Sequence, residues 1–337
     1  MRAVLLTGHG GPEVLDIQSD VAMPTPAPGE VLIRVAAAGV NNTDINTRMG
    51  WYSGGGWTGS FTFPRIQGID ACGEIVGVGT AVDQARVGER VLIEPCWREP
   101  GAPVASARFF GSEVDGAFAD YTVAPARHAH RIDSPLSDVE LASFPCSYST
   151  AENLLVRTAI GPGDRVLVTG ASGGVGSAAV QLAGARRAEV TAVAGADKHD
   201  AVRTLGAARV VARDADPVEM FGPGSFDVVI DVVGGPAWPG LLQVLRPGGS
   251  YGVSGAIAGP LVDLDLRTLY LNDLRLVGCT VLDDGVFAGL IARIERGEVR
   301  PVVAAVFPLE QIVAAQELFA SKQHVGKIVL TVGGSVP

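Results

Sequence analysis

The feature that most constrains the fold is a glycine-rich turn between a short apolar run and an alanine-rich segment. Residues 166–168 read VLV, residues 170–176 read GASGGVG, and residues 177–185 are rich in alanine. A short apolar run bounded by glycine predicts a buried strand, and the segment after the turn predicts a packed helix. Glycines in such a turn let a pyrophosphate approach the backbone, while the N-terminus of the helix offers unpaired N–H groups and a partial positive charge. We interpret the turn as the pyrophosphate site of a dinucleotide.

The same turn allows two other interpretations. Residues 171–176 match G-x-G-x-x-G only with alanine in place of the first glycine, so a turn without any ligand is one alternative. Residues 170–174 also spell G-x-S-x-G around Ser172, the nucleophile elbow of a serine hydrolase. A hydrolase needs a histidine further along, and only His199 and His324 follow. Neither is placed as a triad base, and a solvated surface histidine explains each better, so the hydrolase is the poorer interpretation.

Length and charge exclude several classes of protein. The chain has 337 residues, of which 47% are hydrophobic, enough for two domains with their own cores. Its net charge of −10, with scattered basic residues, argues against nucleic acid and anionic membrane partners. The apolar stretch at the N-terminus is too short for a signal peptide, and no apolar run approaches the roughly 20 residues of a membrane helix. The four cysteines stand far apart without a C-x-x-C pair, which predicts a cytoplasmic protein without disulfides.

The pattern of predicted secondary structure changes near residue 133. Before it, short β-branched runs separated by Gly/Pro/Asp turns predict a barrel-like β domain. After it, a helical stretch running from Ser137 to about Ile160 is followed by alternating strands and helices, which predict a parallel sheet with helices on both faces. The apolar run 274–281 predicts an edge strand, and pairing with a second subunit is one way to cover it.

A glycine and aromatic loop lies between residues 51 and 63. It is either a surface loop with aromatic rings tucked beneath it, or the wall of a pocket for an apolar substrate, and the sequence leaves both open. The rings are Trp51, Tyr52, Trp57, Phe61 and Phe63.

The end of the second strand of the dinucleotide unit bears on the identity of the cofactor. NAD-binding folds place a carboxylate there, about 20 residues past the glycines, to bind the ribose hydroxyls. This chain has no carboxylate at the strand end, and Lys198 follows, with His199 or Arg203 close by to help bind a 2′-phosphate. We therefore predict NADP(H). Asp197 could still act as the carboxylate, and Lys198 could be an ordinary surface lysine.

Motifs spread over nearly the whole chain resemble the medium-chain dehydrogenase/reductase superfamily, and within it the zinc-free quinone oxidoreductase-like branch. They are GEVLI at 29–33, GVNNTD at 39–44, GIDACGEIV at 68–76, VGERV at 87–91, GDRV at 163–166, the glycine turn, LGA at 205–207, LRPGG at 245–249 and VGKIVL at 325–330. The resemblance implies an α/β protein with a GroES-like, β-rich catalytic domain built from residues 1–145 and 287–337. It further implies a central Rossmann domain with a doubly wound parallel sheet at residues 146–286, and a cleft between the two domains.

The resemblance also bears on metal content. Zinc alcohol dehydrogenases of the superfamily place a catalytic cysteine where this chain has Asn41 and a histidine where it has Ile69. Only the positions of Asp70 and Cys146 keep side chains that can bind a metal, whereas a catalytic zinc needs three protein ligands. The segment 94–110, where a structural zinc would be held by four cysteines, contains one. We expect no zinc.

Without a metal, reduction of a conjugated acceptor is easier than reduction of a simple ketone, because the charge of the transition state spreads into an enolate that hydrogen bonds can stabilise. By resemblance, the catalytic residues are Asn41, Thr43 and Tyr52: Asn41 faces the nicotinamide and substrate, Thr43 takes the position of a proton-relay hydroxyl, and Tyr52 donates to the substrate oxygen. The alternatives are that Asn41 and Thr43 only satisfy a turn and that Tyr52 only packs. Asp44 is expected to brace the loop.

These expectations combine into one hypothesis, an NADPH-dependent, zinc-independent reductase of apolar quinones or enones that forms a homodimer. The residues expected to contact the cofactor are Asn41, Thr150, Gly170, Ala171, Ser172, Gly173, Gly174, Val175, Gly176, Lys198, Val233, Ser254 and Lys327. For Lys327, near a family position that contacts the pyrophosphate, a surface lysine is the alternative. Two other functions stay open: a cofactor-binding relative with little turnover, and a zinc-type alcohol dehydrogenase.

Overall fold

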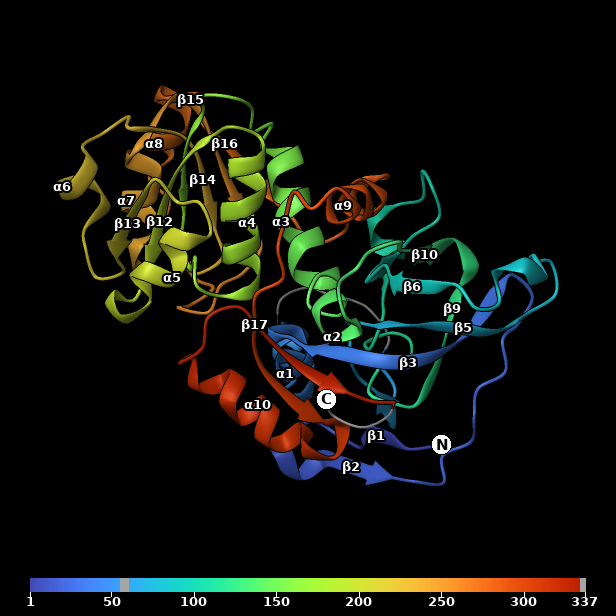
Figure 1. Ribbon diagram of the computed structural model, residues 1–337. Helices are drawn as coiled ribbons and strands as arrows, with labels where there is room; N and C mark the ends of the chain where they lie inside the picture. The colour runs from blue at the N-terminus through green and yellow to red at the C-terminus, as the bar shows by residue number, and fades with distance from the viewer. Residues whose placement is uncertain (55–60, 334–337) are drawn as a thin grey trace. The chain divides into compact units, whose positions relative to one another are not determined.

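The computed structural model describes residues 1–54 and 61–333 and divides the chain into two compact units (Figure 1). The first unit consists of Met1–Cys146 and Pro301–Pro337, and the second of Ser147–Arg300. Trp57 of the aromatic loop lies outside the described residues. No helix in the described part of the chain is both long and apolar enough to cross a membrane.

The first unit is built around a seven-stranded sheet that joins the two ends of the chain. Its strands run in the order β10-β6-β5-β3-β18-β17, and β9 also pairs with β3. Their bounds are β3 Glu30–Val40, β5 Cys72–Val78, β6 Arg90–Ile93, β9 Tyr121–Pro125, β10 Ala129–Arg131, β17 Val303–Pro308 and β18 Lys327–Thr331. The C-terminal strand β18 pairs antiparallel with β3, with Ile328 opposite Val40. This register brings Lys327 to the end of β3, where α1 (Asn42–Arg48) begins.

The remaining elements of the first unit are short. A three-stranded sheet contains β1 (Ala3–Leu6), β2 (Leu15–Gln18) and β4 (Arg65–Ile66), and a two-stranded sheet contains β7 (Cys96–Trp97) and β8 (Arg108–Phe109). Two further helices are α2 (Asp138–Leu141) and α10 (Ile312–Ser321). The last four residues of β3, 37–40, are all buried, because side chains on both faces of the strand are covered there. Its branched residues lie in one apolar core with rings such as Phe110 and Phe118.

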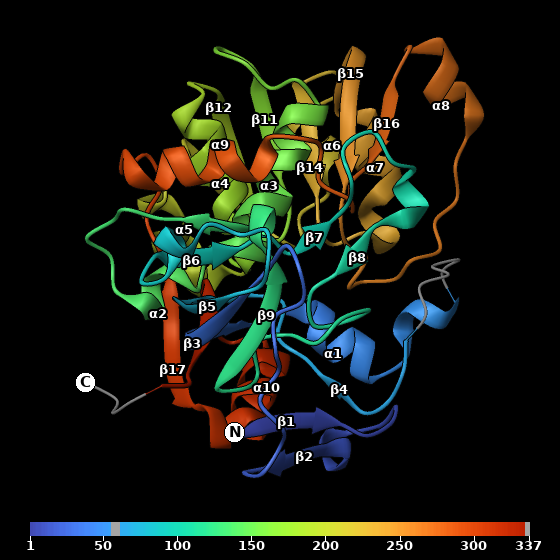
Figure 2. The ribbon, with the colours of Figure 1, turned by 90° about the vertical axis from the view of Figure 1, so that its right-hand side faces the viewer.

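The second unit is a six-stranded parallel sheet in the order β13-β12-β11-β14-β15-β16. The strands are β11 Arg165–Val168, β12 Glu189–Ala194, β13 Arg209–Ala212, β14 Phe226–Asp231, β15 Leu245–Val253 and β16 Arg275–Gly278. The helices are α3 Pro145–Arg157, α4 Gly174–Ala185, α5 His199–Thr204, α6 Pro217–Phe221, α7 Trp238–Gln243, α8 Leu266–Leu271 and α9 Val286–Glu295. Figure 2 shows α3 and α4 on one side of this sheet and α7 and α8 on the other. The strand order is that of a Rossmann fold, so the predicted doubly wound sheet is confirmed.

The second unit extends to Arg300, whereas the expected domain boundary was residue 286. Ion pairs explain why α9 lies with the second unit. Glu152 of α3 accepts hydrogen bonds from Arg186 after α4, at 2.6 Å, and from Arg293 of α9, at 3.3 Å. The carboxylate is only 6% exposed, and a charge so buried is stable only when it is paired.

Several elements differ from the sequence analysis. The single helical stretch expected from Ser137 to Ile160 is two helices, because Pro145 cannot continue α2 and instead begins α3. The predicted edge strand is confirmed as β16, but it is shorter than expected. The strand β17 and the short helices α1, α6 and α8 were not expected.

Candidate active site

The glycine turn joins β11 to α4 at the point where the strand order reverses, which is where such sheets bind nucleotides. Its one left-handed residue is Gly170, with φ of 57°, so alanine fits at position 171, where it is fully buried. A Cβ at Gly176 would lie 2.2 Å from the carbonyl oxygen of Gly170, so only glycine lets α4 pack against the turn. The substitution of the first glycine therefore leaves the shape of the turn intact.

Gly173 is the N-cap of α4, and no side chain caps the first N–H groups of this helix. It is exposed, and a Cβ added there would meet only the carbonyl oxygen of Gly170, at 3.5 Å. The first amides of an α-helix have no partner within the helix, so this turn offers donors and open space to an anion. The residues of the turn therefore fit a pyrophosphate.

The hydrolase interpretation fails on the histidine. His199 is the only histidine between residues 147 and 300. His199 begins α5, and its Nε2 lies 3.3 Å from the carbonyl oxygen of Ala194 at the end of β12. The ring therefore faces the nearby backbone. Since the one histidine of this unit bonds its own backbone and not Ser172, the G-x-S-x-G sequence lacks the histidine base of a serine hydrolase.

The carboxyl ends of β12 and β13 lie side by side, with Ala194 paired to Ala212. Lys198 follows β12 in a half-buried position, whereas Asp197 is exposed. Arg213 directly follows β13 and is also exposed, and it was not among the residues expected at the cofactor. The signal that could have found it is its position, because the residue after each parallel strand points to the same edge of the sheet. Both cations therefore lie on the edge that would hold an adenosine ribose.

A buried carboxylate fixes the turn after β14. Asp231 is fully buried and accepts hydrogen bonds from the hydroxyls of Thr169 and Tyr251, both at 2.5 Å. It also accepts from the amides of Val233, at 2.8 Å, and Gly234, at 3.2 Å. Burial, together with the charge of Asp231, raises the pKa of the Tyr251 phenol. The network ties three strands together and holds Val233 at the carboxyl edge of the sheet.

The other residues of this unit that are expected to contact the cofactor lie after a strand or in the first turns of a helix. Ser254 directly follows β15, and its amide donates to the carbonyl of Asp231 at 3.2 Å. Thr150 is half-buried in the first turns of α3.

In the first unit, the expected catalytic residue Asn41 lies at the end of β3 and is only 5% exposed. Its Nδ2 donates to Asp70 Oδ2 at 2.7 Å and to the Gly39 carbonyl at 3.2 Å, while its Oδ1 accepts from Lys327 Nζ. Both protons of the amide nitrogen are therefore used inside the unit. The resemblance implies that Asn41 faces the nicotinamide and substrate, and in the structure its side chain also connects Asp70, Gly39 and Lys327 within the first unit.

Lys327 also differs from expectation. Its ammonium lies 2.8 Å from Asp70 Oδ2, and the side chains of the two residues are 2% and 0% exposed. Both of its hydrogen bonds stay within the first unit, to Asp70 and Asn41. A cation held in this way is not a surface lysine, and the geometry gives no support to the pyrophosphate contact suggested for it.

Asp44 adds a second carboxylate to this buried group. Its Oδ2 accepts from the backbone amide of Asn41 at 2.8 Å, so it braces the start of α1 as expected. Burial raises the pKa of Asp44 to about 7, and the nearby charge of Asp70 adds to the effect. The Asn41 amide and the ammonium of Lys327 oppose it.

The accessible hydroxyls at this end of the unit belong to Thr43 and Tyr52. Tyr52 Oη donates to Thr43 Oγ1 at 3.3 Å and accepts from Asn46 Nδ2 at 3.4 Å. Thr43 is half-buried, and Tyr52 is 37% exposed. The structure thus brings the two expected residues together and adds Asn46, one turn further along α1, which no sequence motif indicated. Both bonds are long, so the hydroxyls can turn toward a ligand at little cost.

The aromatic loop is partly described. Trp51 is exposed like Tyr52, while Phe63 packs edge-on against Phe61 and His9, with ring centroids 4.9 Å apart in each pair.

The side chains at the zinc position of related enzymes do not fit a zinc ion. By the resemblance, Asn41 and Ile69 take the positions of a cysteine and a histidine that bind zinc in zinc alcohol dehydrogenases, and the carboxylate of Asp70 is already paired with Lys327. Its other oxygen, Oδ1, accepts from the amide of Cys146 at 2.6 Å. Among the residues that the structure describes, no cluster of three histidine, cysteine or acidic side chains could hold a metal.

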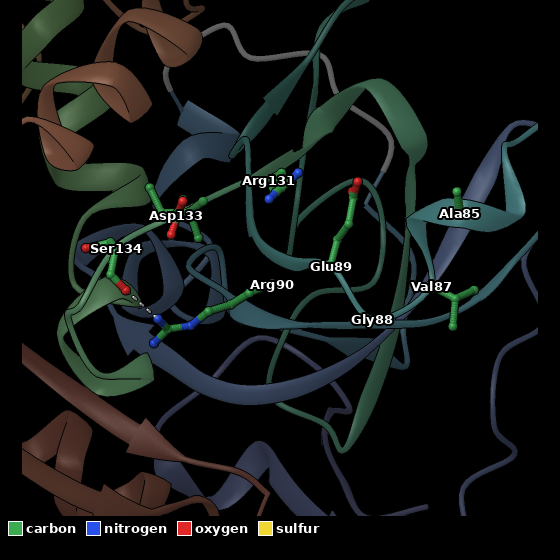
Figure 3. A pocket seen from close by; sticks show the side chains of 9 residues that line it. Ala85, Val87, Gly88, Glu89, Arg90, Arg131, Asp133 and Ser134 are labelled. Carbon is green, nitrogen blue, oxygen red and sulfur yellow. Dashed lines mark hydrogen bonds between the residues drawn. The ribbon is translucent and has the colours of Figure 1, made fainter.

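A surface pocket of about 480 Å³ lies in the first unit, along the ends of β6 and β10 (Figure 3). Its charged lining is mostly engaged by its own neighbours. Arg90 donates to Asp138 and to the carbonyls of Ser134 and Leu136, and Glu89 accepts from Arg86. None of the residues expected at the cofactor or substrate lines this pocket, so we assign it no part in the reaction.

Two family models match the chain. The model described as "Alcohol dehydrogenase GroES-like domain" matches residues 27–134, and the model described as "Zinc-binding dehydrogenase" matches residues 174–296. The chain is also similar to quinone oxidoreductase from Lama guanicoe, with 32% identity over 98% of this chain and 97% of the relative.

Two further similarities cover nearly the whole chain. The NADPH-dependent alkenal/one oxidoreductase of Arabidopsis thaliana is 30% identical over 98% of this chain and 79% of its own length. A solved structure from Sinorhizobium meliloti 1021, classed provisionally as an alcohol dehydrogenase, matches with a TM-score of 0.94 and 45% identity. That match covers 99% of this chain and 97% of the other.

Proposed function

Because the chain belongs to the medium-chain dehydrogenase/reductase superfamily and is an oxidoreductase, we propose that it uses NADPH to reduce quinones or α,β-unsaturated carbonyl compounds without zinc. The observation that carries the proposal is which hydrogen-bond donors are buried and which stay accessible at the end of β3. A lysine ammonium fills the surroundings of Asn41 and Asp70, and the groups left accessible are the hydroxyls of Thr43 and Tyr52. Hydroxyls are weak electrophiles, which suits an acceptor whose developing charge is already delocalised.

The glycine turn and the strand ends of the second unit would hold the cofactor. The open amides after Gly173 bind the pyrophosphate, and Lys198 and Arg213 bind the 2′-phosphate that distinguishes NADPH from NADH. Thr150, Val233 and Ser254 are proposed to contact the nicotinamide half, because they lie at the start of α3 and at the carboxyl ends of β14 and β15. The Arabidopsis relative is named as an NADPH-dependent enzyme, which supports this choice of cofactor.

When bound, NADPH supplies a hydride for the β-carbon of the conjugated acceptor, and negative charge collects on the acceptor oxygen. Tyr52 is proposed to donate a hydrogen bond to that oxygen from its exposed hydroxyl. Asn46 donates to the Tyr52 oxygen in the structure. Thr43 accepts from Tyr52 there, and its hydroxyl would turn to donate to the Tyr52 oxygen once Tyr52 donates to the substrate, so that both groups stabilise the charge that builds up. The aromatic residues near Tyr52 would exclude water from an apolar substrate.

A homodimer is proposed from the edge of the second unit. The edge strand β16 and the neighbouring α8 carry exposed apolar side chains, among them Leu266, Leu271 and Leu276. An open edge of this composition needs a cover, and a second copy paired edge to edge would provide it. The four cysteines are far apart in the sequence and form no C-x-x-C pair, which fits a cytoplasmic protein, because thiols stay reduced in that compartment.

The proposal is tested by following NADPH absorbance with a panel of conjugated enones and quinones, before and after treatment with a strong zinc chelator. The expected result is turnover that chelation leaves unchanged and that is slower with NADH. Consumption of NADPH with none of the acceptors would refute the substrate class. Tight NADPH binding in that case would indicate a cofactor-binding protein with little turnover.

A further inference from the structure

Lys327 is an unusual residue in this chain. The sequence contains three lysines, at positions 198, 322 and 327, and all other permanent cations are arginines. Lys327 is also the most deeply placed of the three, with 2% of its side chain exposed. A compact ammonium differs from a guanidinium in being a near-point charge with three rotatable donors. At this site the chain therefore uses the protein side chain that most resembles a small metal cation.

The contacts of the ammonium match the surroundings of such a cation. Two oxygen atoms from different segments meet at Nζ, Oδ1 of Asn41 and Oδ2 of Asp70, and the carboxylate of Asp44 is close enough to feel the charge. Two buried carboxylates without a cation nearby would repel each other and carry a large desolvation penalty. The ammonium partly neutralises this pair.

The same contacts organise the start of α1. Asp70 Oδ2 accepts from both Lys327 and Asn41, and its Oδ1 accepts from the amide of Cys146. Asn41 connects these contacts to α1, because its backbone amide donates to the carboxylate of Asp44 in the first turn of the helix. Thr43 lies between Asn41 and Asp44 in the sequence, so the position of its hydroxyl follows from how firmly that turn is held.

We propose that Lys327 is a tethered cation that takes the place of a metal ion in this active site and, through Asn41 and Asp70, positions the Thr43 and Tyr52 hydroxyls. This inference rests on the proposed function for its kinetic consequences, but not for its binding consequences. Lys327 is a positioning residue, since none of its hydrogen bonds reaches the accessible hydroxyls themselves.

The test replaces the tethered cation with a free one. Lys327→Ala leaves a space lined by Asp70 and Asn41, and added methylammonium or ethylammonium should enter it. We expect kcat of the variant to fall by about 100-fold and to recover about tenfold with these ions, because a small displacement of the donors is costly. Tetramethylammonium, which has no N–H donor, should restore nothing. Lys322→Ala, which removes an exposed lysine that contacts Asn42, is the matched control and should keep wild-type kcat.

Two measurements separate this inference from the proposed function. Ethylammonium should raise the melting temperature of Lys327→Ala by about 2–4 °C and leave the wild type unchanged, whether or not any acceptor is reduced. The Kd of NADPH should be the same in both proteins. Equal effects of ethylammonium and tetramethylammonium would overturn the proposal, as would a weaker Kd for NADPH in the variant, which would indicate a direct cofactor contact.

A second variant covers the case in which Lys327→Ala does not fold. Lys327→Met together with Asp70→Asn removes both charges at nearly constant volume and should restore a folded protein. The inference predicts that this double variant binds NADPH normally but keeps a low kcat. Wild-type kcat in a folded double variant would overturn it.

Discussion

Replacing Gly173 with aspartate should separate the stability of the glycine turn from its binding of phosphate. Gly173 has φ of −79° and ψ of 173°, a conformation open to any residue, and a Cβ there finds free space. An aspartate at this N-cap would accept from the first amides of α4, and the loss of glycine would also stiffen the unfolded chain. Together these effects should raise the free energy of unfolding by about 0.5–1 kcal/mol.

The same aspartate should nearly abolish binding of NADPH. The carboxylate would accept hydrogen bonds from the amides that the pyrophosphate needs, and it would place a negative charge beside the pyrophosphate. At a separation of ~6 Å and an effective dielectric constant of ~20, one such repulsion costs about 3 kcal/mol, or more than 100-fold in Kd. Gly173→Asn caps the helix without the charge, so the difference between the two variants isolates the repulsion. Asparagine should therefore weaken binding less than aspartate does.

The assays are thermal unfolding and titration of NADPH by fluorescence. We expect a variant that is at least as stable as the wild type and that binds NADPH more weakly by the factor above. Gly176→Ala should behave in the opposite way and lose stability, because its Cβ would collide with the carbonyl of Gly170. An aspartate variant that binds NADPH as tightly as the wild type would refute the assignment of the turn.

Four further predictions follow from the same geometry. Tyr52→Phe should lower kcat for an enone by about tenfold with little change in melting temperature, since the tyrosine is half-exposed and its hydrogen bonds are long. Steady-state kinetics of the double variant with Thr43→Val would then show whether the two hydroxyls act as a pair. A non-additive loss of kcat would show that they do, and additive losses would show that they do not. The pKa of Asp44 is raised from 3.8 to about 7, so the folded state binds this proton more tightly than the unfolded chain does. The free energy of unfolding should therefore decline as the pH rises from about 4 to about 7. In chemical denaturation measured across this pH range, Asp44→Asn should flatten the decline, and an unchanged slope would contradict the assignment. Leu271→Asp, at an exposed position of α8, should convert a dimer into a monomer in analytical ultracentrifugation without loss of NADPH binding, whereas a dimer that survives would place the interface elsewhere. Arg213→Ala should raise the Kd of NADPH by about tenfold and leave that of NADH unchanged, and an equal effect on both would remove it from the 2′-phosphate site.

The sequence was sufficient to predict the second unit because its signals are local. Alternating strands and helices define the parallel sheet, and the glycine turn marks where the strand order reverses. The alanine at position 171 looked like a defect in the motif. The structure shows that the left-handed residue is Gly170, so the alanine costs the turn nothing.

The surroundings of Asn41 could not be predicted, because they depend on a contact between distant parts of the chain. Lys327 reaches Asn41 and Asp70 only because β18 pairs with β3 in one register. From the sequence, Lys327 was expected to contact the pyrophosphate, with a surface lysine as the alternative, and neither expectation includes a buried pair with Asp70. The extent of the second unit was missed for a similar reason, since α9 is fixed there by a buried ion pair with Glu152.

The measurement that tests the central claim most directly is the fate of deuterium from NADPH labelled at C4 of the nicotinamide. The protein, treated with a chelator and shown by elemental analysis to be free of zinc, would be given this cofactor and a simple cyclic enone, and the product examined by NMR. The account predicts a saturated ketone with deuterium on the former β-carbon, formed at an undiminished rate. Deuterium on the carbonyl carbon of an allylic alcohol, or activity that returns only with added zinc, would contradict it.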